Sequence, residues 1–218
     1  ADSAGHRNGG VQDAPHHRKG DASVEHHQPP LRQRRVQFLQ PVPFMAGGRG
    51  ERLRPLTDET PKPLLRVGDK PIIEHNIDRL ALYGIEKLHI SVKYKAEQIE
   101  SYFGDGSDKG LVIDYIREEN PLGTLGAVTL IPEISTPSML VMNSDLLTDI
   151  DFEDFYRKFE DSGADMAVAS TSYRVDVPYG VLETSGQQIT SLKEKPTYVY
   201  FSNAGIYLIK TEILRQIP

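Results

Sequence analysis

The 218-residue sequence predicts an α/β fold with a mostly parallel, mixed sheet flanked by helices. Short apolar runs alternate five times with segments of helical periodicity, and the connections between them are short. After residue 171 the pattern changes to short strands separated by turns, which predicts a small antiparallel extension. A chain of this length holds one sizeable α/β domain, or such a domain and a tail.

The first element is a strand expected at residues 42–46, directly ahead of a cluster of glycines. Pro41 and Pro43 disagree with this assignment, because proline lacks the N–H that a central strand donates to its neighbour. Two interpretations remain open. Either the strand begins only at Phe44, or the residues before Phe44 are not native to the domain.

The following elements alternate between helix and strand. Pro71 in a first turn, apolar residues at helical spacing and Gly84 just past the end predict a helix over 71–82. The same reasoning predicts, in order, a strand at 88–92, a helix at 96–103 ended by Gly104, a strand at 111–116, a helix at 124–130, a strand at 139–142, a helix at 152–159 and a strand at 166–169. The extension after residue 171, with turns at 178–180 and 185–186, is expected to lie over the carboxyl edge of the sheet, where ligands of open α/β sheets bind.

Residues 1–43 differ from the rest in being rich in His, Arg and Pro. Residues 1–44 carry six Lys/Arg and four Asp/Glu, a balance of +2, so the remainder carries −8 of the total charge of −6. They also hold five of the seven histidines, without apolar periodicity or defined metal-ligand spacing. We expect a disordered tail, a linker, residues added in cloning or the remnant of an N-terminal regulatory region, followed by a catalytic domain at 44–218.

Composition excludes several classes of function. A net charge of −6 argues against a nucleic-acid partner held by a broad basic face. The sequence has no cysteine, so disulfides and Cys-based metal sites are excluded. No apolar run approaches the roughly 18 residues of a membrane span, and no signal peptide opens the chain. We therefore expect no membrane partner and a cytoplasmic location, while association into homo-oligomers is left open.

Three glycines within four positions, Gly47, Gly48 and Gly50, predict a loop that grips a polyphosphate. Such a backbone turns sharply and brings its N–H groups close to a phosphate, with no Cβ in the way. Arg52 and Lys62 add positive charge nearby. The loop is neither a P-loop nor a dinucleotide fingerprint, and glycine spacing alone is equally consistent with a plain turn.

Asp145 follows the apolar run 139–142 and should lie just beyond the carboxyl end of a central strand. An oxygen ligand at that place suits a Mg²⁺ ion bridging a triphosphate and a second substrate, although capping of the next turn is an alternative. Asp149 and Asp151 precede the helix expected at 152–159, so we expect them to cap it.

The string A-G-G-R-G-E-R-L-R-P-L-T from Ala46, followed by P-K-P-L from Pro61, resembles the motif of the sugar-1-phosphate nucleotidylyltransferases. The resemblance continues in register through residues 67–73, 120–127, 140–145, 178–181, 194–196 and 203–207, and it covers about 44–218. The segments at 120–127 and 178–196 are most similar to the mannose-1-phosphate guanylyltransferase-like branch and to UTP- or dTTP-using branches such as glucose-1-phosphate thymidylyltransferase. The resemblance implies a Rossmann-like fold.

The resemblance also implies roles for particular residues. Arg52 and Lys62 would act on the triphosphate and the reacting phosphate, and Asp145 would bind Mg²⁺, with Ser144 in place of the usual glycine. The nucleotide would be bound by Ala46, Gly47, Gly48, Gly50, Gly123 and Thr124. The sugar phosphate would be bound by Tyr179, Gly180, Glu194, Lys195 and Asn203.

The family carries a second metal-binding aspartate in a W-x-D-[IV]-G string, which this sequence lacks. From this departure we expect a catalytic domain that is incomplete at its C-terminus and has little activity of its own.

The expected reaction forms a nucleotide sugar and pyrophosphate from a nucleoside triphosphate, by preference GTP, and a hexose 1-phosphate such as mannose 1-phosphate. It requires no general base, because a sugar phosphate with a second pKa of about 6 is already a dianion near neutral pH. One alternative is a non-catalytic regulatory subunit that binds nucleotide sugar. Another is a glycosyltransferase, for which residues 149–151 have the spacing of a D-x-D metal motif.

Overall fold

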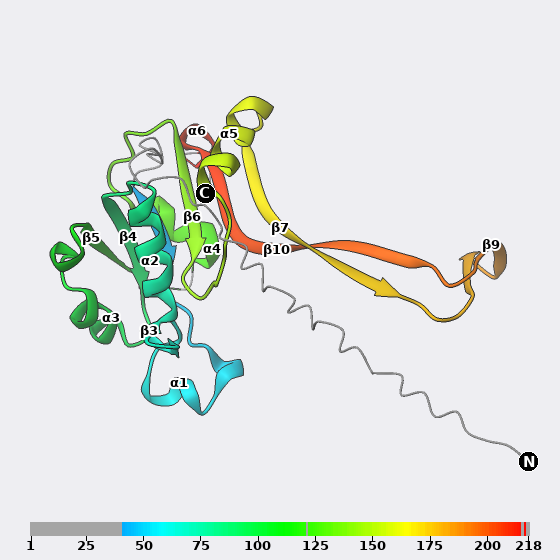
Figure 1. Ribbon diagram of the computed structural model, residues 1–218, viewed down its shortest axis with the longest axis horizontal. Helices are drawn as coiled ribbons and strands as arrows, with labels where there is room; N and C mark the ends of the chain where they lie inside the picture. Colours follow the sequence, from blue (N-terminus) through cyan, green and yellow to red (C-terminus); the bar gives the residue numbers. More distant parts are fainter. Residues whose placement is uncertain (1–40, 121, 215, 217–218) are drawn as a thin grey trace, which may run out of the picture. The chain divides into compact units, whose positions relative to one another are not determined.

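A six-stranded sheet with the strand order β5-β4-β1-β6-β10-β7 organises the computed structural model (Figure 1). The structure describes residues 41–120, 122–214 and 216, all within the unit of the chain that spans 31–218. The expectations for the N-terminal tail fall almost entirely on residues 1–40, which lie outside the described residues, and they stay predictions.

The strands of the main sheet are β1 (Val42–Met45), β4 (Lys87–Val92), β5 (Val112–Arg117), β6 (Ser138–Asn143), β7 (Met166–Asp176) and β10 (Thr197–Lys210). Two small antiparallel sheets pair β2 (Arg66–Val67) with β3 (Lys70–Pro71) and β8 (Val181–Ser185) with β9 (Gln188–Lys193). The α-helices are α1 (Leu56–Glu59), α2 (Ile72–Leu82), α3 (Ala96–Phe103), α4 (Gly123–Gly126), α5 (Phe152–Ser162) and α6 (Thr211–Leu214). Short 3₁₀ turns are η2 (Glu51–Leu53), η3 (Lys62–Leu64), η4 (Ser107–Lys109) and η5 (Ala127–Leu130).

Four neighbouring strands, β5, β4, β1 and β6, run parallel, whereas β10 is antiparallel to β6 and β7. The predicted mostly parallel, mixed sheet is therefore confirmed. β1 begins at Val42, so the alternative start at Phe44 is wrong. β1 pairs with β4 from Val42 onward but with β6 only from Phe44, so Pro43 precedes the ladder to β6 and its missing N–H is tolerated.

Helices cover both faces of the sheet. Successive strand side chains point to opposite faces, and apolar side chains on both faces of the central strands are buried. Alternate strand residues such as Phe44 and Ile90 belong to the larger core cluster, together with apolar side chains from α2, α3 and α5. The intervening residues, for example Met139 and Val141, face a smaller cluster with Val128 of η5 and apolar side chains near α6.

Two predicted elements differ from the structure. The helix expected at 124–130 is a single α-turn, α4, followed by the 3₁₀ turn η5. The hydroxyl of Thr129 donates to the carbonyl of Gly126 at 2.7 Å, which competes with α-helical bonding, and glycine itself weakens a helix. The strand expected at 166–169 continues to Asp176, because β10 pairs with it as far as Thr197.

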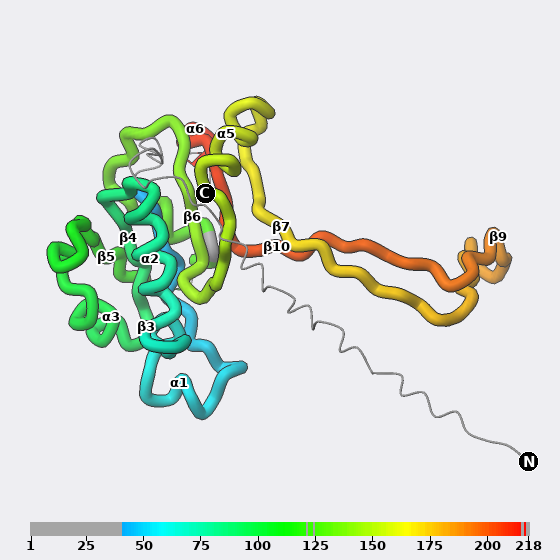
Figure 2. Tube along the Cα trace, viewed as in Figure 1, coloured from blue at the N-terminus to red at the C-terminus, as the bar shows by residue number. Residues whose placement is uncertain are grey.

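The predicted antiparallel extension consists of the far parts of β7 and β10 and the hairpin β8–β9. Figures 1 and 2 show β7 and β10 side by side along their paired length. We refer to residues 171–203 as the ribbon. Its residues are largely exposed, with Tyr179 and Phe201 each 74% exposed, so the ribbon is held chiefly by its own strand pairing.

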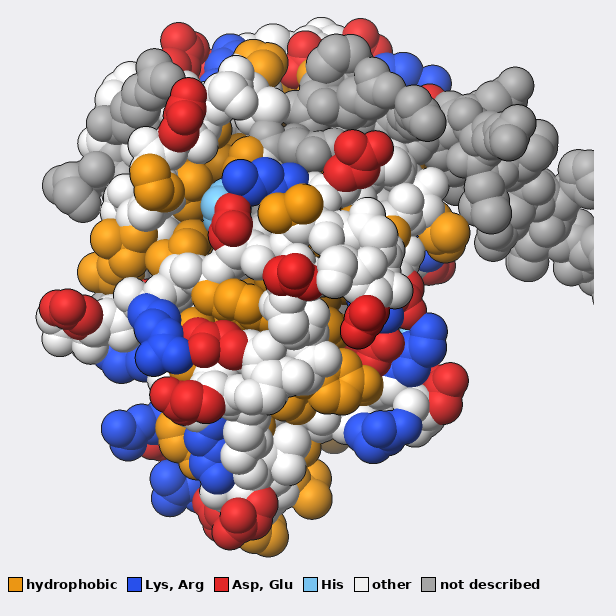
Figure 3. Space-filling model, turned by 90° about the vertical axis from the view of Figure 1, so that its left-hand side faces the viewer, with side chains coloured by type: hydrophobic (Ala, Val, Ile, Leu, Met, Phe, Trp, Pro, Cys, Tyr) orange, Lys and Arg blue, Asp and Glu red, His pale blue; other side chains and the backbone are white. Residues whose placement is uncertain are grey.

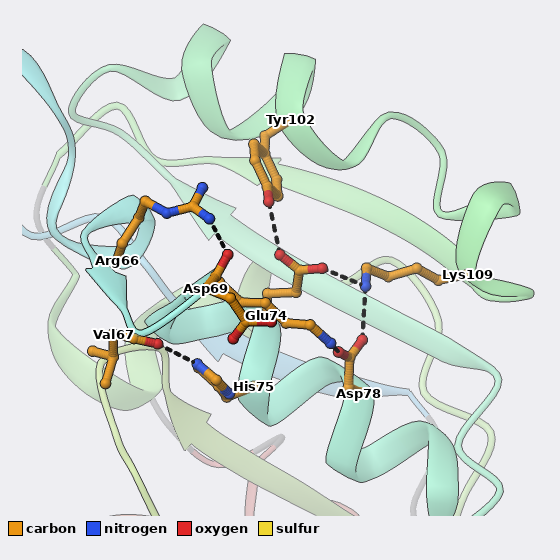
Figure 4. A network of polar contacts seen from close by, with 9 residues as sticks. Arg66, Val67, Asp69, Glu74, His75, Asp78, Tyr102 and Lys109 are labelled. Carbon is orange, nitrogen blue, oxygen red and sulfur yellow. Dashed lines mark hydrogen bonds and ion pairs between the residues drawn. The ribbon is translucent and has the colours of Figure 1, made fainter.

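A network of charged side chains joins α2 to η4 (Figure 4). The Lys109 ammonium lies 2.7 Å from Glu74 Oε1 and 2.7 Å from Asp78 Oδ1, and the Tyr102 hydroxyl donates to Glu74 at 2.7 Å. Burial acts to raise the pKa of the Glu74 carboxyl, but the hydrogen bonds from Lys109 and Tyr102 outweigh it and hold that pKa below its ordinary 4.5. The pKa of Asp78 is lowered in the same way, because bonds from Lys109 and Lys70 outweigh burial.

Candidate functional site

A cleft of about 980 Å³ opens at the carboxyl ends of the four parallel strands. β1, β4, β5 and β6 each contribute the residues that directly follow the strand or end it. The cleft is lined by residues 45–53, 62–63, 93–95, 118, 123 and 143–145. β1 lies where the chain order reverses, with β4 on one side and β6 on the other, which is the place where open α/β sheets bind ligands.

The glycine loop between β1 and η2 forms one wall of this cleft. Gly50 adopts a left-handed backbone with φ of 64°, and a Cβ there would lie 2.9 Å from Thr57 Cγ2 and 3.1 Å from Lys62 Cβ. Thr57 is buried, and its hydroxyl donates to the Gly50 carbonyl at 3.0 Å. Gly50 is therefore needed both for the turn and for the close approach of the segment that carries Lys62.

The loop that lines the cleft carries backbone donors without acceptors among the described residues. Within the described part of the chain, the N–H groups of residues 47–51 have no protein acceptor, and the loop closes only afterwards with Leu53 N–H donating to Gly50 O at 2.9 Å. A Cβ built on Gly48 meets no atom within 4 Å, so open space adjoins the backbone at that point. Successive N–H groups pointing into a concave site favour an anion such as a phosphate.

Lys62 and Asp145 meet in the cleft although they are 83 residues apart in sequence. The Lys62 ammonium forms an ion pair with Asp145 Oδ2, and both side chains remain partly accessible, at 37% and 26%. Ser144 is buried at the edge of the cleft, and its hydroxyl and N–H both bond to the Met45 carbonyl, at 2.9 and 3.2 Å. The serine that replaces the family's glycine thus fastens the Asp145 segment to β1.

The structure adds cleft residues that the sequence reasoning missed. Lys93, Tyr94 and Lys95 follow β4, and Glu118 follows β5. Glu118 accepts hydrogen bonds from the Ser91 hydroxyl and, at 3.3 Å, from the Leu122 N–H. Their position directly after predicted strands was a usable signal, because parallel strands bring their carboxyl ends to one edge.

The predicted site residues fall into two groups. The structure brings together in the cleft the glycines of the loop, Ala46, Arg52, Lys62, Gly123 and Asp145. Thr124 lies in α4, and its side chain is outside the described residues.

The residues predicted to bind the sugar phosphate lie on the ribbon and do not line the cleft. Tyr179, Gly180, Glu194 and Lys195 are all exposed. Asn203 is engaged within β10: its amide donates to the Tyr207 hydroxyl at 2.9 Å, and its carbonyl oxygen accepts from the Gly205 N–H at 2.8 Å. The roles of these residues stay predictions.

Other carboxylates have structural positions. Asp151 caps α5 by accepting from the N–H groups of Glu153 and Asp154 at 3.0 and 3.1 Å, as predicted. Asp149 instead lines a different cavity beside α2. The described residues contain no group of three or more His, Asp or Glu side chains arranged to hold a metal.

The surface and the helices add two observations. On the face drawn in Figure 3, acidic and basic side chains are interspersed, as on an ordinary solvated surface. Among the described helices, none is long and apolar enough to cross a membrane.

A mostly parallel α/β sheet with a glycine loop and paired cationic and acidic side chains at its carboxyl edge is an arrangement typical of the α/β proteins that bind phosphorylated ligands. The family model described as "Nucleotidyl transferase" matches residues 44–218. The chain belongs to the nucleotidyl transferase family, and its relatives place it with the sugar-1-phosphate nucleotidylyltransferases, as the motifs predicted.

The relatives described here are mannose-1-phosphate guanylyltransferases, one of the branches that the motifs suggested. The chain is 34% identical over 183 residues to mannose-1-phosphate guanyltransferase beta-A of Xenopus laevis, covering 80% of this chain and 51% of the relative. It is 32% identical over 180 residues to mannose-1-phosphate guanylyltransferase of Mycobacterium tuberculosis, covering 80% and 50%. The chain thus spans about half the length of the curated relatives it matches.

Solved structures share the fold. A putative glucose-1-phosphate thymidylyltransferase from Bacillus anthracis, in complex with a sucrose, aligns with a TM-score of 0.63 at 27% identity, covering 80% of this chain and 72% of that one. HddC from Yersinia pseudotuberculosis complexed with GMP-PN aligns with a TM-score of 0.62 at 26% identity, covering 81% and 79%.

Proposed function

We propose that the protein transfers a nucleotidyl group from a nucleoside triphosphate to a hexose 1-phosphate, forming a nucleotide-diphospho-sugar and pyrophosphate. The observation that carries this proposal is the cleft at the carboxyl edge, which is lined both by the glycine loop, whose amides are unpaired within the described residues, and by Arg52, Lys62 and Asp145. Family membership supports the same reaction class.

In the proposed reaction, a phosphate oxygen of the sugar 1-phosphate attacks the α-phosphorus of the triphosphate. The bond to the bridging oxygen breaks, and pyrophosphate leaves with that electron pair. The N–H groups of residues 47–51 hold the triphosphate, and Arg52 and Lys62 neutralise charge that develops on its oxygens. Catalysis then consists of positioning and electrostatic stabilisation, without a proton transfer to assign.

Asp145 is the residue that would hold a divalent ion, for which we propose Mg²⁺. Mg²⁺ is commonly bound by one or two carboxylates together with substrate phosphates and water, so a single carboxylate facing a phosphate cleft fits it. The ion would supply further neutralisation of phosphate charge. Lys62, already paired with Asp145, would turn toward the phosphates once they are present.

The sugar side of the site is proposed for the ribbon. Tyr179, Gly180, Glu194, Lys195 and Asn203 would hold the hexose and its phosphate when the ribbon meets the cleft. A connection to the cleft exists at the base of the ribbon. A Cβ on Gly205 would lie 2.5 Å from the side-chain amide of Asn143, which lines the cleft.

GTP is the proposed triphosphate, and Glu118 is the residue that favours it. A carboxylate only accepts hydrogen bonds, and each of its oxygens keeps lone pairs beyond the bonds to Ser91 and Leu122. The Watson–Crick edge of guanine presents two adjacent donors, N1–H and the N2 amino group, which match a carboxylate. The names of the curated relatives point to GTP and mannose 1-phosphate as well.

A screen of pyrophosphate release tests the proposal, using four nucleoside triphosphates against the 1-phosphates of glucose, mannose, glucosamine and N-acetylglucosamine. The protein in its full natural length should be most active with GTP and mannose 1-phosphate. Glu118→Gln should lower kcat/KM for GTP by roughly 10- to 100-fold relative to the other triphosphates, because one acceptor oxygen is replaced by an NH₂ donor and a charge-assisted hydrogen bond to guanine is lost.

Binding of nucleotide sugar without pyrophosphate release in any combination would favour a regulatory subunit. Transfer of sugar from a nucleotide sugar would favour a glycosyltransferase. The cytoplasmic location predicted from the sequence stays a prediction.

A further inference from the structure

The backbone beside Asp145 is fastened on both sides. Before Asp145, Ser144 bonds to the Met45 carbonyl of β1 through its hydroxyl and its N–H. After Asp145, the side-chain amide of Asn76 in α2 donates to the Leu146 carbonyl at 2.7 Å. The two neighbours of the carboxylate are therefore tied to different elements of the fold.

Asn76 is an unusual residue for its position in α2. It is 2% exposed and lies on the helix face that contributes Ile73, Ile77 and Leu80 to the core. Burying an amide in apolar surroundings is unfavourable unless it is hydrogen-bonded, and asparagine is a weak helix former. Its second contact, to the Ile72 carbonyl, is long at 3.4 Å. The hydrogen bond to the Leu146 carbonyl is therefore the one that offsets the cost of burying the Asn76 amide.

Arg79, one turn further along α2, holds the other end of the same segment. Its Nη2 donates to the Ile150 carbonyl at 2.5 Å. Its guanidinium also lies 5.9 Å from the ring centroid of Tyr83 and 6.0 Å from that of Phe152, within cation–π range. α2 therefore grips residues 146–150 at both ends.

We propose that Asn76, with Arg79, is a positioning residue that orients the Asp145 carboxylate toward Lys62 and the cleft. Neither residue lines the cleft, so neither contacts the proposed substrates directly. Residues that orient a ligating group through hydrogen bonds commonly matter about 10- to 100-fold for metal affinity or activity. The catalytic part of this inference rests on the proposed function, whereas the anchoring of residues 144–150 does not.

The informative variant is Asn76→Leu. Leucine suits the apolar face of α2 and is a better helix former, so the fold should persist. The side chains of Leu146 and Ile150 still pack against the core, so the segment should lose its orientation rather than unfold.

His75→Leu is the matched control. His75 directly precedes Asn76 in the same helix. Its Nε2 bonds to a different backbone carbonyl, that of Val67, at 2.8 Å (Figure 4).

The first experiment is hydrogen exchange, followed by mass spectrometry, on the ligand-free protein. Backbone amides in 143–151 should exchange faster in Asn76→Leu than in the wild type and stay unchanged in His75→Leu. This measurement requires no activity, so it remains decisive if the wild type releases no pyrophosphate and the proposed function fails.

The second experiment separates orientation from binding. GTP binding without metal should be unchanged in Asn76→Leu, while Mg²⁺-dependent kcat falls by about 10- to 100-fold at an unchanged KM for GTP. Unchanged exchange of 143–151 would overturn the anchoring. Faster exchange with wild-type kcat, from an enzyme that is active, would overturn the positioning of Asp145. Both measurements should be repeated on Arg79→Met, which removes the contact at the other end of the segment. In this variant the backbone amides of 149–151 should exchange faster than in the wild type.

Discussion

Replacing Gly48 with valine tests whether the glycine loop binds the triphosphate through its backbone. Gly48 is exposed, lies in the cleft and has no atom within 4 Å of the position that a Cβ would take. A branched side chain there would project into the space next to the free N–H groups of residues 47–51. It would keep a phosphate from the backbone without disturbing a protein contact.

The expected magnitudes follow from these contacts. A substitution at such an open position should change the free energy of unfolding by no more than about 0.5 kcal/mol. A hydrogen bond from a backbone N–H to a charged phosphate contributes about 1.5–3 kcal/mol. Loss of two such bonds amounts to about 3–6 kcal/mol, which corresponds to a roughly 100- to 10,000-fold weaker Kd.

Calorimetric titration with GTP, together with thermal unfolding, separates the two quantities. Gly48→Val should lose GTP affinity and keep its Tm. Gly50→Ala should instead lower the Tm, because Gly50 has a φ of 64° and an added Cβ would lie 2.9 Å from Thr57 Cγ2. The left-handed backbone alone should cost about 1–2 kcal/mol of folding free energy. A Gly48→Val protein that folds and binds GTP with wild-type affinity would refute the assignment of the loop.

Three further predictions concern other parts of the molecule. Lys109→Met should lower the free energy of unfolding at pH 7 by about 1–3 kcal/mol, and chemical denaturation should show the deficit shrinking as the pH falls below about 4. The direction follows from linkage, because the pKa values of Glu74 and Asp78 are lower in the folded protein than their ordinary 4.5 and 3.8. The two ionised carboxyls stabilise the fold above these ordinary values, and the stabilisation is lost as the pH falls through the folded pKa values. Lys158→Met is the control, because it removes an exposed ion pair with Asp154 and should leave the free energy of unfolding unchanged at pH 7 and at acidic pH. An equal loss of stability in Lys109→Met and Lys158→Met would contradict the contribution assigned to the Lys109 network. In steady-state kinetics, Lys195→Ala should raise the KM for the sugar 1-phosphate far more than the KM for GTP. Equal increases in the two KM values would show that Lys195 does not act on the sugar phosphate alone. In the protein at its full natural length, Asp145→Asn should reduce Mg²⁺-dependent turnover by about 100-fold or more while leaving Tm unchanged, and substantial turnover would show that the metal is held elsewhere.

Much of the sheet could be predicted because its signals are local. The alternating apolar residues of β4, the apolar run of β6 and the glycines that follow α2 and α3 mark elements whose formation depends on nearby residues. The cleft could be located for a related reason. Parallel strands align their carboxyl ends, so residues that follow different strands must meet at one edge.

The longer strands could not be predicted in full, because their extent depends on partners far along the chain. β7 continues past residue 171 only through its pairing with β10, in which Asp176 lies opposite Thr197. Most β7 residues are exposed on both faces, so no apolar alternation marks the continuation. Lys93 and Lys95 escaped notice for another reason. A lysine pair after a strand looks like an ordinary solvated turn until the topology places it beside the glycine loop.

Several residues of the glycine motif acquire a physical explanation only from the structure. Thr57 is buried, and its hydroxyl closes the loop by donating to the Gly50 carbonyl. Gly50 lacks a side chain so that Lys62 can approach the loop, and Lys62 reaches Asp145 from there. The motif therefore shapes the glycine loop and also places Lys62 beside Asp145, a carboxylate 83 residues away in the sequence. A substitution at Thr57 should accordingly disturb phosphate binding through the shape of the loop, although its side chain faces the protein interior.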